Sequence, residues 1–351
     1  MTKAAELAKM GEVLTNSQIG GRRNMVINGA MQVAQRGTSG FTTNAVYTLD
    51  RYKVFCPAAS FTLSQSTTAP TDFYHSLKIE NTSAATPSSG NGGNIFTTLE
   101  GNSVSQLNWG TSNAKTATLS FYVRANNTGT YCVSLENANG TIGTGSHSFV
   151  TEYTINSADT WEEKKILIPG PTVGTWKTNT TLGIVIGWTL EVGSNFETST
   201  TDAWQSGLKR QTSNQVNWQQ TASANFHLTG VQLEVGSVAT PFEHRSFSEE
   251  KKLCERYYFQ TQSQNFAGVA SGTNRLIAGY RIPDMRATPS FTFISYNGTT
   301  ARLARATNNA DTVFSSASVT SLNGFYQVTS STNTFIAGEG YFGQLKCESE
   351  L

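Results

Sequence analysis

The chain has 351 residues, only 14% of them charged, and its 25 basic and 24 acidic residues leave a net charge of +1. Nucleic-acid-binding proteins normally carry a basic excess or a basic stripe, whereas the densest basic clusters here are pairs such as Arg22-Arg23. We therefore expect no nucleic-acid partner. No apolar run approaches the roughly 20 residues that span a bilayer, so we also expect no membrane insertion. The charged N-terminus lacks the apolar core of a signal peptide.

Four cysteines, Cys56, Cys132, Cys254 and Cys347, lie far apart in the sequence and form no C-x-x-C pair. A disulfide-rich secreted domain would contain cysteine more densely, and a zinc site would cluster its ligands. The spacing predicts isolated buried thiols in a protein made in the cytoplasm.

Residues 1–23 are predicted to form an anchoring arm. The sequence favours a helix over residues 3–14, in which Leu7, Met10 and Leu14 share one face. Twelve residues are marginal for an isolated helix in water. We expect this arm to be ordered only against sister chains or a larger assembly; the alternative is a frayed terminus.

Residues 24–245 show short strands separated by turns. Apolar and polar residues alternate over residues 116–123, 165–168, 182–188 and 226–234, which indicates one buried and one solvated sheet face. Asn-Gly and Gly-Gly pairs at 28–29, 92–93 and 139–140 are typical of tight hairpin turns. About ten strands without intervening helices predict a jelly-roll-like β-sandwich.

Residues 246–262 are predicted to form a connector helix. Ser246 and Glu249 make an S-x-x-E capping box, and Leu253, Cys254 and Tyr257 then fall on one side, together with Tyr258.

Residues 263–351 return to a strand pattern, with apolar segments at 276–282, 290–294, 324–328 and 340–345. They predict a smaller C-terminal β-sandwich whose limited core would benefit from packing against sister chains. The predicted fold class of the whole chain is therefore all-β.

The acids and histidines show no catalytic pattern. Glycoside hydrolysis generally needs two carboxylates at a fixed separation, and no local pattern couples any two of the candidates. These are Asp50, Glu80, Glu100, Glu136 and Glu191. The histidines, at positions 75, 147, 227 and 244, lack metal-ligand spacing, and no G-x-S-x-G elbow is present. We expect no catalysis, no metal and no cofactor, and we expect His227 to be a solvated strand residue.

Tryptophans supply the candidates for sugar contact, because sugars stack their C–H faces on aromatic rings. Trp109, Trp176 and Trp204 lie in polar, turn-rich segments and are the candidate glycan contacts. The alternative for each is burial in the core, where tryptophan is usually found. Trp161 and Trp188 lie within alternating strands and are predicted to be core residues.

Several stretches resemble a family of tail-fibre and receptor-binding-type proteins of tailed bacteriophages. Residues 21–38 read GRRNMVINGAMQVAQRGT, and residues 47–52 read YTLDRY. Further matching stretches are LSFYVRA at 119–125, TGVQLEVG at 229–236, ATPFE at 239–243, CERYY at 254–258 and MRATP at 285–289. The resemblance covers most of residues 20–351, and the middle domain is similar to carbohydrate-binding-module jelly rolls.

The sequence departs from the family pattern at two places. Tyr52 stands where a Trp often follows Asp-Arg, and residues 96–101 read FTTLEG where a more polar segment is usual. Both changes keep bulk, so neither threatens the predicted fold.

The resemblance implies a virion structural protein that is assembled in the host cytoplasm and located in the virion. It implies a homotrimeric tail-fibre component that docks on other virion proteins through its N-terminal arm and contacts host-surface glycan. A capsid or tail decoration (cement) protein and a polysaccharide depolymerase are the alternatives.

The stretch TGVQLEVG also has a reading from the residues alone. Val231 and Leu233 are predicted to face the core, and Gln232 and Glu234 to face away from it. Glu234 would then pair with an arginine such as Arg51 or Arg256. Asp50 and Arg51 are interpreted as a structural ion pair or hydrogen-bonding pair at a strand end.

Overall fold

The computed structural model describes residues 3–5, 22–138, 140–278, 280–313, 317–322, 325–330 and 334–351. The chain divides into two compact units, residues 1–251 with Leu351, and residues 252–350. Residues 3–5 are helical, while the predicted docking residues Leu7, Met10 and Leu14 lie outside the described residues. No helix in the described part of the chain is both long and apolar enough to cross a membrane.

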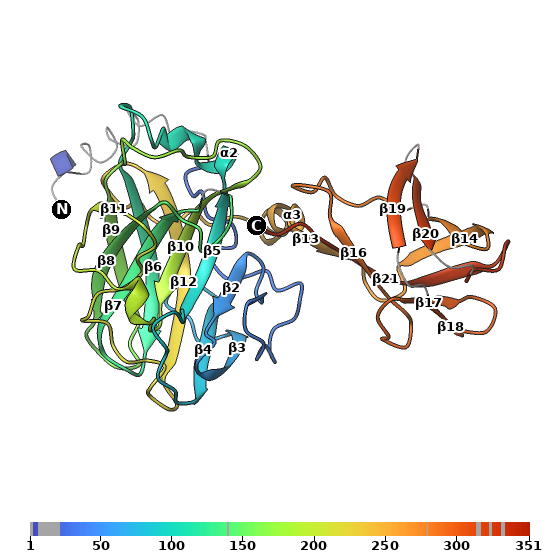
Figure 1. Cartoon of the computed structure of the whole chain (residues 1–351), viewed down its shortest axis with the longest axis horizontal. Coiled ribbons are helices and arrows are strands. Elements are labelled where there is room, and N and C mark those ends of the chain that lie inside the picture. Colours follow the sequence, from blue (N-terminus) through green and yellow to red (C-terminus); the bar gives the residue numbers. More distant parts are fainter. Residues whose placement is uncertain are drawn as a thin grey trace. The chain divides into compact units, whose positions relative to one another are not determined.

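The first unit contains two antiparallel sheets, whose strands run side by side in Figure 1. The seven-stranded sheet has the order β1-β2-β5-β10-β7-β8-β11. Its strands are β1 (Val46–Tyr47), β2 (Tyr52–Phe55), β5 (Asn94–Glu100), β7 (Gly129–Asn137), β8 (His147–Ile155), β10 (Leu182–Thr189) and β11 (Trp204–Ser206). Two short helices, α2 (Gly101–Val104) and η1 (Ser105–Leu107), follow β5, and η2 (Ser194–Phe196) follows β10.

The five-stranded sheet has the order β3-β4-β12-β6-β9. Its strands are β3 (Ser60–Ser66), β4 (Ser76–Ser83), β6 (Ala117–Ala125), β9 (Glu162–Ile168) and β12 (Asn225–Val235). Every alternating segment that the sequence indicated between residues 116 and 234 is a strand, in β6, β9, β10 and β12.

The main core lies between these two sheets. Phe121 of β6 meets Trp188 of β10 edge to face, with ring centroids 5.7 Å apart, and Tyr131 of β7 lies 5.6 Å from Phe226 of β12. All four side chains are fully buried, as Trp188 was predicted to be. Aromatic contacts of this kind add to the area that the rings bury, so they help fix how the sheets face each other. The predicted jelly-roll-like β-sandwich is confirmed.

A bulge interrupts β12 where the strand passes Phe121. Thr229 pairs with Tyr122 and Gln232 pairs with Ser120, so one extra residue lies on β12 between these pairs. The segment from Asn24 to Gly29 fills this gap, because the Val231 amide donates to the Gly29 carbonyl at 3.0 Å. A side chain at residue 29 would overlap the Val231 carbonyl oxygen, which accounts for the glycine of the Asn28-Gly29 pair.

The predicted connector helix is shorter than expected. Helix α3 spans Phe247–Glu255, and its capping contact is present, since the Glu249 amide donates to the Ser246 hydroxyl at 3.4 Å. Residues 258–260, which were assigned to the helix, instead form strand β13 (Tyr258–Gln260) and pair with β21. The ladder to β21 offers these backbone groups partners that a further helical turn would forgo.

The second unit contains one nine-stranded sheet organised around β21 (Gly340–Glu348). Strands β14 and β17 pair with the beginning of β21, whereas β13 and β16 pair with its end, so both parts of the sheet share this strand. Its other strands are β14 (Phe266–Gly272), β15 (Arg275–Ala278), β16 (Ser290–Ile294), β17 (Arg302–Arg305), β18 (Asp311–Val313), β19 (Ala317–Leu322) and β20 (Phe325–Ser330). A separate core, which includes Phe266, Phe293 and Leu345, draws on both parts.

Candidate functional site

A hollow of about 700 Å³ in the first unit opens on the outer side of the five-stranded sheet. Three parts of the chain line it: the sheet itself, the loop that precedes β4 and the segment that follows β12. Its eleven lining residues are Thr71, Asp72, Phe73, Tyr74, Ser120, Tyr122, Glu163, Gly230, Pro241, Phe242 and His244.

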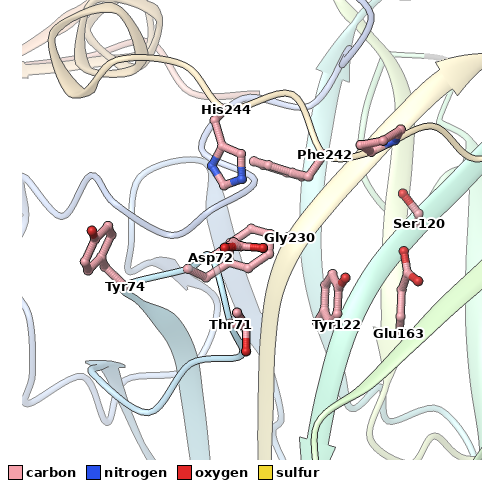
Figure 2. A pocket seen from close by; sticks show the side chains of 11 residues that line it. Thr71, Asp72, Tyr74, Ser120, Tyr122, Glu163, Gly230, Phe242 and His244 are labelled. Atoms are coloured by element: carbon pink, nitrogen blue, oxygen red, sulfur yellow. The ribbon is translucent and has the colours of Figure 1, made fainter.

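Strands β6 and β9 supply the floor of the hollow. Tyr122 pairs directly with Glu163 across the ladder, so both side chains stand on the same outer face. Ser120 lies two residues before Tyr122 and therefore faces the same way. Figure 2 shows Ser120, Tyr122 and Glu163 grouped on one side, with Tyr74 on the opposite side of the hollow.

The loop before β4 supplies a ring cluster centred on Phe73. Its ring lies 5.4 Å from that of Tyr122, 5.0 Å from that of Phe242 and 5.3 Å from the His244 imidazole. Phe242 and His244 also meet edge to face at 4.9 Å. Tyr74, the next residue in the loop, is 79% exposed. The loop therefore combines one ring that packs with one that is open to a ligand.

Gly230, at the bulge of β12, lets Phe73 approach the sheet. A Cβ atom on residue 230 would lie 2.8 Å from both the Phe73 Cζ and the Tyr122 Cδ2 atoms. Its φ of 62° is in the left-handed region, which favours glycine. The glycine of the TGVQLEVG stretch is thus required by the wall of the hollow.

Gln232 and Glu234 hold the segment that follows β12 against the sheet. The Glu234 carboxylate accepts hydrogen bonds from the Thr240 amide at 2.8 Å and from the Thr240 hydroxyl at 2.6 Å. The Gln232 side chain donates to Thr240 and accepts from the Glu243 amide at 2.8 Å. Both side chains face away from the core, as predicted, but they are buried under this returning segment. These hydrogen bonds, which we call the clamp, place Phe242 and His244 at the hollow.

The clamp corrects the expected partner of Glu234, which is bound by Thr240 and Gln232 rather than by an arginine. The Arg51 guanidinium donates to the carbonyl and hydroxyl of Thr98 at 2.7 and 2.9 Å. Asp50 accepts from the amide and side chain of Gln35 at 2.7 and 2.6 Å. Asp50 and Arg51 are both buried, and each binds another part of the first unit; the pairing of the two with each other stays a prediction.

Charged side chains lie near the Tyr122 hydroxyl. Burial raises the pKa of Tyr122, the nearby carboxylates of Glu163 and Asp72 raise it further, and the Lys165 ammonium group lowers it. Glu163 makes an exposed ion pair with Lys165 at 2.8 Å. Asp72 has no hydrogen-bond or ion-pair partner among the described residues.

The three tryptophans predicted as glycan contacts come together in one cluster, outside this hollow. Their ring centroids are 5.0 to 5.2 Å apart, and all three pairs meet edge to face. Each indole N–H donates to a backbone carbonyl: Trp109 to Lys115, Trp176 to Val173 and Trp204 to Pro169. Trp109 is buried and the other two are partly exposed. The rings pack on one another and against the main core, and their donors are used, so this geometry suits a structural role.

His227 was predicted to be solvated, and this is wrong. Its side chain is 2% exposed, its Nδ1 lies 3.2 Å from the Ser76 hydroxyl, and its Nε2 lies 3.4 Å from an Arg124 nitrogen. The ring of Trp161 meets it edge to face at 5.9 Å. Trp161 is therefore partly exposed on the outer face and is not part of the core, contrary to prediction. Alternation places a side chain on the outer face, but it does not show what covers that face.

Four of the carboxylates considered for hydrolysis, Asp50, Glu80, Glu136 and Glu191, bind partners at separate places. Glu136 binds Arg210 in a buried ion pair at 2.6 Å, and Glu80 binds Lys78 at 2.6 Å. Glu191 lines a smaller hollow of about 290 Å³, where it accepts hydrogen bonds from the Gln219 amide and the Gln220 side chain. Burial raises the pKa of Glu191. Within the described ranges, no group of three or more His, Cys, Asp or Glu side chains could hold a metal ion.

All four cysteines are described, and they are buried and form no disulfide, as the spacing predicted.

The residues of the large hollow were not identified as a site from the sequence. Phe73 and Tyr74 come from an irregular loop, and Tyr122 and Glu163 come from strands that are 41 positions apart in the sequence. The available signal was the pair of stretches TGVQLEVG and ATPFE, which resemble tail-fibre proteins and contain Gly230, Pro241 and Phe242.

Comparison with known proteins found no matching family model and no matching curated protein. Among solved structures, a bacteriophage CBA120 tailspike protein 4 domain is 13% identical with a TM-score of 0.31, over 61% of this chain and 21% of that chain. The C-terminal family 22 carbohydrate binding module of Clostridium thermocellum Xyn10B is 13% identical with a TM-score of 0.31, over 58% of this chain and 98% of that chain. The CBM22-2 xylan-binding domain of Paenibacillus barcinonensis Xyn10C is 13% identical with a TM-score of 0.32, over 54% of this chain and 94% of that chain.

This chain spans about a fifth of the tailspike chain that it matches. Likenesses at these TM-scores are too distant to assign a function, and the fold follows from the strands and their pairing.

Proposed function

We propose that this chain is a non-catalytic virion protein of a tailed bacteriophage, a tail-fibre component that binds host-surface glycan at the hollow on its five-stranded sheet. The virion part of the proposal rests on the sequence stretches that resemble tail-fibre proteins. The binding part rests on one observation: an open hollow of about 700 Å³ in which the exposed Tyr74 ring and partly exposed rings stand beside carboxylates and hydroxyls.

The chemistry of the lining suits sugars. A sugar ring offers an apolar C–H face and a rim of hydroxyls, so it needs an accessible aromatic face and nearby polar acceptors. Tyr74 and Phe242 supply the rings, Asp72 and Glu163 the acceptors, and Ser120 a hydroxyl. Figure 2 shows these groups around one space, with the strands as its floor.

The test is a glycan array probed with the intact chain, followed by calorimetry on the best ligand. Tyr74→Ala should weaken binding about tenfold or more while leaving the unfolding midpoint unchanged, because Tyr74 is 79% exposed. Trp176→Ala is the matched aromatic control. It should destabilise the fold by about 2–3 kcal/mol and leave binding intact, since its ring packs in the tryptophan cluster.

The opposite pattern, with binding lost in Trp176→Ala and kept in Tyr74→Ala, would move the glycan site to the tryptophans. Sustained release of reducing sugar from host glycan would contradict the non-catalytic proposal and favour a depolymerase. Antibody labelling of the chain over the capsid rather than the fibre tips would favour the decoration protein.

A further inference from the structure

The hollow carries an excess of negative charge. Asp72 and Glu163 are among its eleven lining residues, and none of the eleven is lysine or arginine. Elsewhere on this sheet face, acids and bases are paired: Lys78 binds Glu80 at 2.6 Å, and Arg124 binds Asp159 at 2.8 Å. Asp72 differs from these acids because it has no such partner among the described residues.

Glu163 has a partner that a ligand could replace. Its ion pair with Lys165 is exposed on both sides, with 37% and 54% of the two side chains accessible. Exposed ion pairs of this kind contribute roughly 0–1 kcal/mol. A ligand cation that also contacts aromatic rings can therefore compete with the lysine for the carboxylate.

Aromatic rings surround the same space. Tyr74 and Tyr122 lie on either side of Asp72 in Figure 2, with Phe242 above them, and the Phe73 ring packs against both Tyr122 and Phe242. The negative face of an aromatic ring attracts an ammonium group, by about 0.5–1 kcal/mol when exposed and about 2 kcal/mol when desolvated. Carboxylates and ring faces around one cavity are thus complementary to a cation carried on an otherwise neutral ligand.

We propose that the hollow selects glycans that carry a free ammonium group, such as an unacetylated amino sugar, over the same sugar in its neutral N-acetylated form. The ammonium group would lie between Asp72 and Glu163 while the sugar ring contacts Tyr74. This inference rests on the proposed glycan-binding function and names the ligand class of that site.

The experiment is calorimetry on the intact chain with two oligosaccharides of equal length, one a β-1,4-linked glucosamine oligomer and the other its fully N-acetylated counterpart. At a pH where the amine is protonated, the glucosamine oligomer should bind about tenfold more tightly. The preference should shrink as salt is raised, because Asp72 and Glu163 are exposed to solvent.

Two variants test the assignment of the carboxylates. Asp72→Asn and Glu163→Gln should each reduce the preference several-fold while retaining binding of the N-acetylated oligomer. Glu80→Gln removes a carboxylate from the same sheet face outside the hollow, and it should leave the preference unchanged.

Each outcome bears on a separate claim. Equal binding of the two oligomers, or tighter binding of the N-acetylated one, overturns the ammonium selectivity and leaves glycan binding standing. A preference that survives both carboxylate substitutions also overturns it. If neither oligomer binds, the selectivity is wrong, and a blank glycan array with the same preparation would overturn the proposed function as well.

Discussion

His227 shows how one buried side chain can make stability depend on pH. Burial, followed by the positive charges of Arg124 and Lys78, lowers its pKa from 6.5 to about 3. The unfolded chain therefore takes up a proton near pH 6.5, and the folded chain does so only near pH 3. Stability is complete above pH 6.5 and falls as the pH drops through this window, by up to about 1.4 kcal/mol per pH unit.

We predict that His227→Gln flattens this dependence. Between pH 7 and pH 4.5 the unaltered chain should lose about 2–3 kcal/mol of unfolding free energy on account of His227, and the variant should lose correspondingly less. Urea unfolding of both chains at the two pH values measures the difference. Equal losses in the two chains would show that His227 does not carry the effect.

Gly230 offers a second test with a matched control. Gly230 and Gly207 both have positive φ, but a Cβ at Gly207 would meet nothing within 4 Å. Gly207→Ala should therefore cost only the backbone strain, about 1 kcal/mol. Gly230→Ala should cost about 1–2 kcal/mol more, because Phe73 and Tyr122 must move. Gly230→Ala should also weaken glycan binding. Thermal unfolding measures the stability of both variants, and calorimetry measures their binding. Equal effects of the two substitutions would contradict the role of Gly230.

At the scale of elements, the segment that follows β12 is held by side chains of that strand. Glu234→Ala removes the acceptor of both Thr240 bonds, and we predict a loss of about 2–3 kcal/mol. Hydrogen exchange should accelerate over residues 237–244, and glycan binding should weaken because Phe242 and His244 lose their placement. Glu80→Ala removes one side of an exposed ion pair and should change neither the hydrogen exchange nor the glycan binding. Unchanged hydrogen exchange in Glu234→Ala would disprove the clamp.

At the bulge of β12, two of the stretches that resemble tail-fibre proteins, residues 21–38 and 229–236, lie side by side. The Met25 amide donates to the Leu233 carbonyl at 2.9 Å, and the Asn24 side chain donates to the Val231 carbonyl at 3.0 Å. Arg245 donates to the Val26 carbonyl at 3.1 Å. Segments more than 200 positions apart in the sequence therefore hold the bulge of β12 in place. Because Gly230 of this bulge lines the hollow, a substitution in either segment should disturb the hollow.

At the scale of the whole molecule, the prediction concerns assembly. The proposed fibre geometry predicts a homotrimer, which would have three times the 37.9 kDa mass of the chain. Light scattering on the intact chain measures this mass directly. A stable monomer at micromolar concentration would contradict the fibre role and would leave glycan binding by the first unit unaffected.

The sequence by itself determined the all-β class, the positions of β6, β9, β10 and β12, and the start of α3. These features follow from periodicity and capping, which are local properties of the chain. It also indicated the inward direction of Val231 and Leu233. The end of α3 was misjudged, because the pairing of residues 258–260 with β21 depends on a strand about 90 positions later.

Only the tertiary structure decided what covers each outward face. Alternation assigned His227 and Glu234 to the outer side of the sheet, yet Trp161 and the segment around Thr240 bury them there. The hollow likewise joins Asp72, Tyr122, Glu163 and Phe242 through long-range packing that no local pattern encodes. Side-chain periodicity reports the direction in which a residue points, whereas a binding site depends on which distant segments meet in that direction.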